Sequence, residues 1–102
     1  MTTSGDPVAR EVLRRTKGLK PNQRLIMQLY AVMPKEFSGA VKQTATNLAG
    51  ELGMTPTLFS RVRGELAKDG WLEEVDRISN SPIFRLGEKA TGERTVIPLR
   101  SA

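Results

Sequence analysis

Apolar residues recur at intervals of three and four over most of positions 8–66, the spacing that places them on one face of an α-helix. The strongest run lies between Pro21 and Pro34 and consists of Leu25, Ile26, Leu29, Val32 and Met33. Pro34 disfavours helix at the residue before it, so this helix is expected to end near Met33. The pattern predicts four helices, over residues 7–17, 22–33, 45–52 and 56–68.

Residues that favour helix ends support these boundaries. Asp6, Thr44 and Thr55 precede predicted helices as N-caps, and proline follows Asp6 and Thr55 at the first helical position. Gly18 and Gly53 follow predicted helices, where a left-handed residue is favoured. The third and fourth helices are therefore expected to be joined by a tight turn.

The third and fourth helices have distinct inward and outward sides. We expect the inward residues to be Ala45, Leu48, Ala49, Leu52, Leu58, Phe59, Val62 and Leu66, with Met54 filling the corner between the helices. The outward positions of the fourth helix are polar or small, and they are Thr57, Ser60, Arg61, Gly64 and Lys68.

The pattern changes after Asp69-Gly70. Residues 71–77 and 82–86 are typical of two strands, joined by a turn-rich segment at 78–81, and Pro82 fits the start of a strand. A very short strand is expected at 40–43 and a loop at 87–93. The apolar run at 95–99 indicates an edge strand or a partner-binding tail.

The order of these elements predicts a mainly α fold with a small β-hairpin, in the α+β class. It is the order of a winged helix-turn-helix with four helices plus a wing, in which the hairpin is the wing. We expect a disordered N-terminus at 1–5, one domain at 6–86 that includes an N-terminal basic helix, and a short tail at 87–102.

The composition excludes several kinds of chemistry. The 102-residue chain has neither cysteine nor histidine, so disulfides, thiolate metal sites and histidine catalysis are ruled out. It also lacks a paired-acid motif and a Gly-rich phosphate loop, so we expect no enzyme, metal or cofactor. No apolar run approaches the ~20 residues of a membrane span, and the start, MTTSGDPVAR, has no apolar signal core. We expect a cytoplasmic, nucleoid-associated protein.

The net charge of +5 indicates an anionic partner, most often nucleic acid. The charge is uneven, because residues 1–40 carry seven basic and three acidic groups whereas residues 41–86 carry six of each. Three of the basic groups, Arg10, Arg14 and Lys17, share one face of the first helix. This distribution gives weight to the N-terminal helix.

The segment LAGELGMTPTLFSRVRGELAKDGWLEEV resembles the winged helix-turn-helix of MarR-type bacterial transcriptional regulators. The shared pattern is Leu-Ala-x-x-Leu-Gly, an apolar residue and a capping Thr, then Phe-Ser-Arg-Val and Leu-x-x-x-Gly-Trp-Leu, and the resemblance covers roughly residues 40–86. Members of that family are longer and dimerise through long terminal helices, whereas the tail here contains Gly87, Gly92 and Pro98. The family's drug-responsive regulation therefore does not carry over.

The resemblance implies that the fourth helix enters the major groove of double-stranded DNA and that the wing approaches the neighbouring minor groove. Arg61 would pair with a guanine, and free backbone donors at Thr55 would face a phosphate. The expected DNA-binding residues are Thr44, Thr46, Thr55, Thr57, Ser60, Arg61, Lys68, Arg77, Asn80 and Arg85, with Arg10, Arg14 and Lys17 as candidate phosphate contacts.

Purely structural roles compete with these assignments. Thr44 and Thr55 are N-caps before they are DNA contacts, and Arg61 also fits a solvated helix position. Arg63 lies nearer the packed side and has an acid such as Glu51 as a candidate partner. Trp71 is expected to pack under the wing rather than to stack on a base.

The sequence thus predicts a transcriptional regulator, most simply a repressor, that acts by occupying an operator. A homodimer or larger assembly is expected because one module buries only ~600–1,000 Å² on DNA. Candidate dimer contacts are Val8, Val12 and Leu13 on the first helix and Val96, Ile97 and Leu99 in the tail. Two alternatives stay open: a plasmid or phage replication or partition factor, and a protein-interaction module that does not bind DNA.

Overall fold

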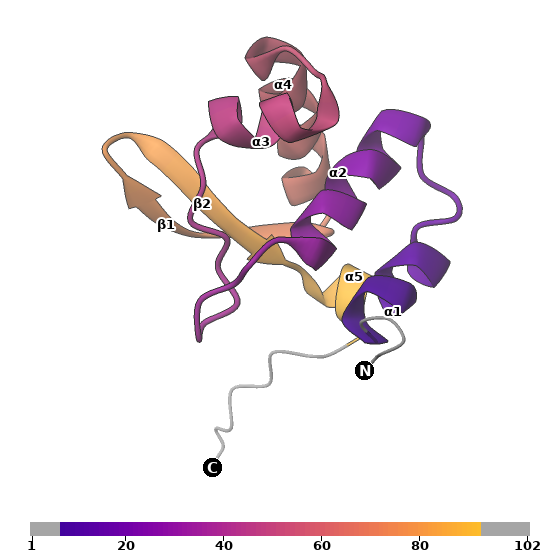
Figure 1. Cartoon of the computed structure of the whole chain (residues 1–102). Helices are drawn as coiled ribbons and strands as arrows, with labels where there is room; N and C mark the ends of the chain where they lie inside the picture. The colour runs from indigo at the N-terminus through magenta and orange to yellow at the C-terminus, as the bar shows by residue number, and fades with distance from the viewer. Residues whose placement is uncertain (1–6, 93–102) are drawn as a thin grey trace, which may run out of the picture.

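The computed structural model describes residues 7–92, which form five helices and one two-stranded antiparallel sheet (Figure 1). The elements in chain order are α1 (Pro7–Arg15), α2 (Pro21–Val32), α3 (Ala45–Leu52), α4 (Pro56–Lys68), β1 (Leu72–Ile78), β2 (Ser81–Leu86) and α5 (Glu88–Thr91). The prediction of a mainly α fold with a small hairpin is confirmed. The predictions for residues 1–5 and 95–99 lie outside the described residues.

Three boundary predictions need correction. The first helix ends at Arg15, and residues 16–18 form a turn in which the Leu19 amide donates to the Thr16 carbonyl oxygen at 3.0 Å. The predicted strand at 40–43 is reduced to one bridge between Val41 and Phe84. The predicted loop at 87–93 contains the short helix α5, which local sequence does not favour because four residues cannot form a stable helix alone.

The helix α5 is held by packing. Its Ala90 is fully buried in the common core, and α5 lies against α1. Gly92 ends it in a left-handed conformation with a φ of +77°. Tertiary contacts therefore supply the stability that the helix lacks by itself.

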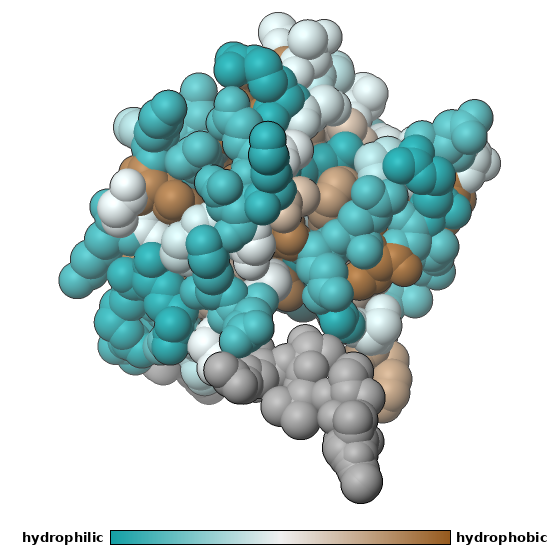
Figure 2. Space-filling model, turned by 180° about the vertical axis from the view of Figure 1, so that it is seen from behind, coloured by the Kyte–Doolittle hydropathy of each residue, from teal (hydrophilic) through white to brown (hydrophobic). Residues whose placement is uncertain are grey.

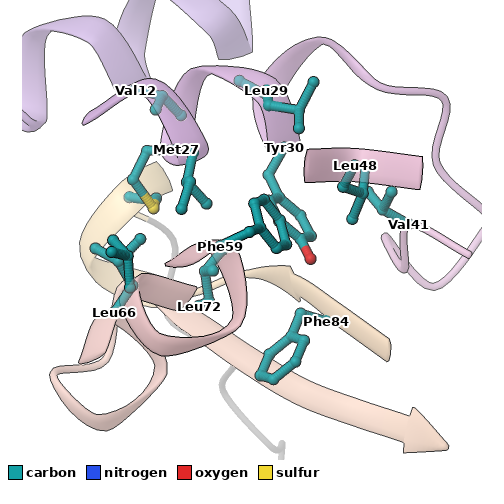
Figure 3. Packing of buried hydrophobic residues seen from close by; sticks show 14 of the residues in the cluster. Val12, Met27, Leu29, Tyr30, Val41, Leu48, Phe59, Leu66, Leu72 and Phe84 are labelled. Atoms are coloured by element: carbon teal, nitrogen blue, oxygen red, sulfur yellow. The ribbon is translucent and has the colours of Figure 1, made fainter. Parts of the chain in front are cut away.

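The core joins side chains from all parts of the described chain. Figure 3 shows Tyr30 of α2 beside Phe59 of α4, and the same cluster of buried residues includes Phe84 of β2. Val12 of α1 is also fully buried, so its assignment to a dimer contact was wrong. The other two candidates in α1, Val8 and Leu13, are 41% and 46% exposed, and Val96, Ile97 and Leu99 lie outside the described residues.

Arg63 is a charged member of this interior. It is only 4% exposed, and its Nη1 donates to the Tyr30 hydroxyl oxygen at 3.4 Å. Its guanidinium lies over the Phe59 and Phe84 rings. The expected ion pair with an acid such as Glu51 is therefore wrong, since the partners of Arg63 in the described residues are aromatic.

The elements divide the molecule into two ends. α3 and α4 pack against each other, and α4 also contacts β1. α2 separates this end from α1 and α5, which lie on the side away from the hairpin turn (Figure 1). None of the helices within residues 7–92 has the length and apolar character that crossing a membrane requires.

Candidate functional site

The connection between α3 and α4 is built by local hydrogen bonds that the sequence predicts. Thr44 Oγ1 accepts from the Asn47 amide at 3.2 Å, and Thr55 Oγ1 accepts from the Leu58 amide at 3.1 Å. Gly53 adopts a φ of +71°, which allows the chain to leave α3 and begin α4 three residues later. The N-cap predictions for Thr44 and Thr55 are confirmed, and that for Asp6 lies outside the described residues.

α4 has one buried and one exposed side. Its buried residues are Phe59, Val62, Arg63 and Leu66. The five positions predicted to face outward are all exposed, and they are Thr57, Ser60, Arg61, Gly64 and Lys68. We call Thr57, Ser60, Arg61 and Gly64 the α4 outer row.

Arg61 is the one cation in the α4 outer row. Its side chain is 66% exposed, and its Nη1 lies 3.7 Å from Glu65 Oε2 one turn further along the helix. An exposed pair of this kind contributes little to stability, so the guanidinium can change partner at small cost. Lys68 lies at the other end of α4, about 18 Å along the axis from the first helical turn.

Gly64 leaves the helix backbone open on this exposed side. A Cβ placed on Gly64 would meet no atom within 4 Å, so the fold itself does not require glycine there. Glycine inside a helix costs about 1 kcal/mol relative to alanine. A glycine at this position is therefore consistent with another molecule that approaches the backbone of α4 closely.

The hairpin carries three of the expected contact residues, and the two arginines among them form ion pairs within the chain. Arg77 Nη2 lies 3.1 Å from Glu74 Oε2, and its Nη1 donates to the Asn80 carbonyl oxygen at 3.2 Å. Arg85 lies 2.9 Å from Glu73 Oε1. Asn80 lies in the hairpin turn with a φ of +70°. The positive charges of the hairpin are thus balanced by neighbouring acids.

The basic face of the first helix lies apart from α4. Arg10, Arg14 and Lys17 are exposed, but α1 is on the far side of α2 from α4 (Figure 1). Arg14 and Arg15 both bind the Glu11 carboxylate. These hydrogen bonds lower the pKa of Glu11, and the bond from Arg15 has the larger effect. The structure therefore does not bring these candidate phosphate contacts to the same surface as the α4 outer row.

Sequence reasoning missed the neighbours of Arg61 on α2. Lys20 and Asn22, at the start of α2, line a shallow groove together with Arg61 and Leu58 of α4. Gln23 Nε2 donates to Glu65 Oε1 at 3.3 Å across the same gap. These residues are about 40 positions apart in the chain, and no local pattern indicates that they meet.

Thr46 completes the expected set, as an exposed residue in the first turn of α3. α3 and α4 thus expose hydroxyl groups and one guanidinium, that of Arg61, as hydrogen-bond donors on their outer sides. Within residues 7–92, no three acidic side chains are grouped closely enough to hold a metal ion.

The chain was compared with protein-family models, curated proteins and solved structures, and it matches none of them.

Proposed function

We propose that the chain is a winged helix-turn-helix domain that binds double-stranded DNA and regulates transcription by occupying an operator. In this reading α3 and α4 are the helix-turn-helix, and the β1–β2 hairpin is the wing. One observation carries the proposal: α4 exposes the polar outer row on one side, while its other side is buried and the helix contacts β1. A helix in the major groove needs this division into a packed side and a polar side.

Each member of the outer row has a role in this proposal. Arg61 donates two hydrogen bonds to guanine, and Thr57 and Ser60 contact bases or phosphates. Gly64 allows the duplex to approach the helix closely. Thr44, Thr46 and Thr55, at the helix starts, contact the phosphate backbone while the two caps keep their structural bonds.

A second candidate, a protein-interaction module, is favoured by the charge balance around α4. Residues 41–86 carry six basic and six acidic groups, and Arg77 and Arg85 are already paired. A DNA-binding surface usually has a clear excess of positive charge. The replication or partition alternative uses the same DNA-binding surface and differs only in which duplex it recognises.

The test is fluorescence anisotropy of a random duplex pool with the full chain, at about 50 and about 200 mM salt. We expect binding that weakens with salt and enriches one sequence. Arg61→Ala should reduce the difference in binding free energy between the enriched sequence and other sequences by about 1–3 kcal/mol, because the bidentate contact to guanine is removed. Arg10→Ala removes the same charge on α1 and serves as the matched control, with unchanged preference.

The outcome separates the two candidates. Sequence preference that survives Arg61→Ala would contradict the assignment of α4 as the reading helix. Absence of binding at the lower salt concentration would overturn DNA binding and favour the interaction module.

A further inference from the structure

α1 and α2 enclose an apolar groove at the end of the molecule away from the hairpin. Its lining residues are Leu13, Leu19, Pro21, Arg24, Leu25 and Gln28. Leu13 and Leu25 are each 46% exposed, which is unusual for two leucines that face the same groove. Figure 2 shows a small apolar area surrounded by hydrophilic residues on the side of the molecule formed by α1 and α2. None of its lining residues belongs to the α4 outer row, but Pro21 also lines the groove that contains Arg61, so the two surfaces adjoin at the start of α2.

Gln28 is one of the polar lining residues of the groove. Its Nε2 is buried within the protein and makes no hydrogen bond within the described residues. Because this atom is not exposed on the groove surface, the exposed lining and the charges around it, rather than Gln28, define the occupant.

The chain around the groove is basic. Residues 7–24 carry six basic groups and one acidic group, and that acid, Glu11, is bound by Arg14 and Arg15. Arg15 lies beside Gly92 rather than at the groove, and the lining residue Arg24 donates to the Leu13 carbonyl oxygen at 2.8 Å. Lys17 and Lys20 are exposed beside the lining residues Leu19 and Pro21. An occupant of opposite charge would be attracted to this rim over about 10 Å at ordinary ionic strength.

This charge argues against occupants from the chain itself. A second copy would bring the same basic rim against this one, and like charges facing one another oppose association. The segment 93–102 carries two arginines and one glutamate, so it is not acidic either. The complementary occupant is an acidic segment with apolar side chains.

We propose that the α1–α2 groove binds an acidic amphipathic segment of a partner protein, whose large apolar side chains contact Leu13 and Leu25. The carboxylates of this segment pair with the exposed Lys17 and Lys20. This binding does not depend on the proposed DNA binding. If both occur, the two occupants approach each other at the start of α2, where Lys20 and Arg61 line one groove.

The test uses a displayed library of random peptides of about 16 residues, enough for about four helical turns. The library is selected on the full wild-type chain and then counter-selected on Leu25→Ser. Val32→Ser is the matched control, because Val32 is 61% exposed on the same helix but does not line the groove. Affinities of the enriched peptides are then measured with each variant.

We expect the enriched peptides to combine Asp or Glu with large apolar residues. Their affinity should fall at least ~10-fold with Leu25→Ser and severalfold with Lys20→Gln, and stay unchanged with Val32→Ser and Lys68→Gln. Enriched peptides without acidic residues, or no enrichment over Leu25→Ser, would overturn the proposal. A Leu25-dependent dimer seen by sedimentation would overturn it too, because the groove would then hold a second copy.

Discussion

The guanidinium carbon of Arg63 lies 4.6 Å from the centre of the Phe84 ring, and this contact joins α4 to β2. The same guanidinium lies 5.2 Å from the centre of the Phe59 ring and donates to Tyr30 on α2. One side chain therefore connects the helix that carries the α4 outer row to the hairpin and to the central helix. The orientation of α4 depends on it.

Arg63→Ala should lower the free energy of unfolding by about 2–4 kcal/mol, because it leaves a cavity and removes two cation–π contacts. Arg63→Met should lose less, because methionine fills much of the volume without a buried charge. Urea denaturation followed by circular dichroism measures both. Arg61→Ala is the control on the exposed side and should change stability by no more than about 0.5 kcal/mol. Equal losses for Arg61→Ala and Arg63→Ala would contradict the connecting role of Arg63.

Burial raises the pKa of the Tyr30 hydroxyl above its ordinary value of 10.0, and the hydrogen bond and charge of Arg63 partly oppose this rise. Above pH ~10 the unfolded chain releases the phenol proton while the folded chain keeps it, so stability present at lower pH should fall as the pH rises. Tyr30 is the only tyrosine, so phenolate absorbance reports it alone.

The native protein should show a Tyr30 titration midpoint above that of the urea-unfolded chain. In Tyr30→Phe, the free energy of unfolding should decrease less as the pH rises above ~10, because the titrating hydroxyl is absent. Coincident midpoints in the folded and unfolded chains would show that the hydroxyl is not buried as described.

Gly64→Ala should raise the free energy of unfolding by about 0.5–1 kcal/mol, because the added methyl group meets no atom and alanine favours the helix. It should also weaken duplex binding, because the methyl group lies where the proposal brings DNA close to α4. Thermal unfolding and anisotropy measure the two effects.

Gly50→Ala is the matched control for Gly64. Gly50 is also exposed in a helix with free space around it, so it should give a similar gain in stability with unchanged binding. A Gly64→Ala variant that binds DNA as tightly as wild type would argue against close approach at this position.

Glu74→Gln should release Arg77 from its ion pair at 3.1 Å. If the hairpin contacts DNA as proposed, the freed arginine adds about one phosphate contact, so duplex affinity rises and its salt dependence becomes steeper. Titrations at several salt concentrations give the slope. Glu51→Gln is the control, because it changes the net charge equally without releasing a hairpin arginine. The salt dependence of duplex binding should be steeper for Glu74→Gln than for Glu51→Gln. Equal slopes for the two variants would contradict a specific role of the hairpin in binding.

The sequence by itself determined the features that depend on neighbours within one or two helical turns. The caps at Thr44 and Thr55, the left-handed Gly53 and the limits of α3 and α4 all follow from hydrogen bonds and backbone preferences over a few residues. The exposure of the α4 outer row follows from the 3.6-residue period. Each of these predictions is confirmed for this reason.

The tertiary structure decided the features that depend on residues far apart in the chain. Arg63 meets Tyr30 across 33 positions, and Arg85 pairs with Glu73 across 12. The helix α5 and the burial of Val12 likewise depend on the packing of α1 against α2 and α5. A local pattern fixes which side of an element is apolar, but only the folded chain brings one element against another and gives each charge its partner.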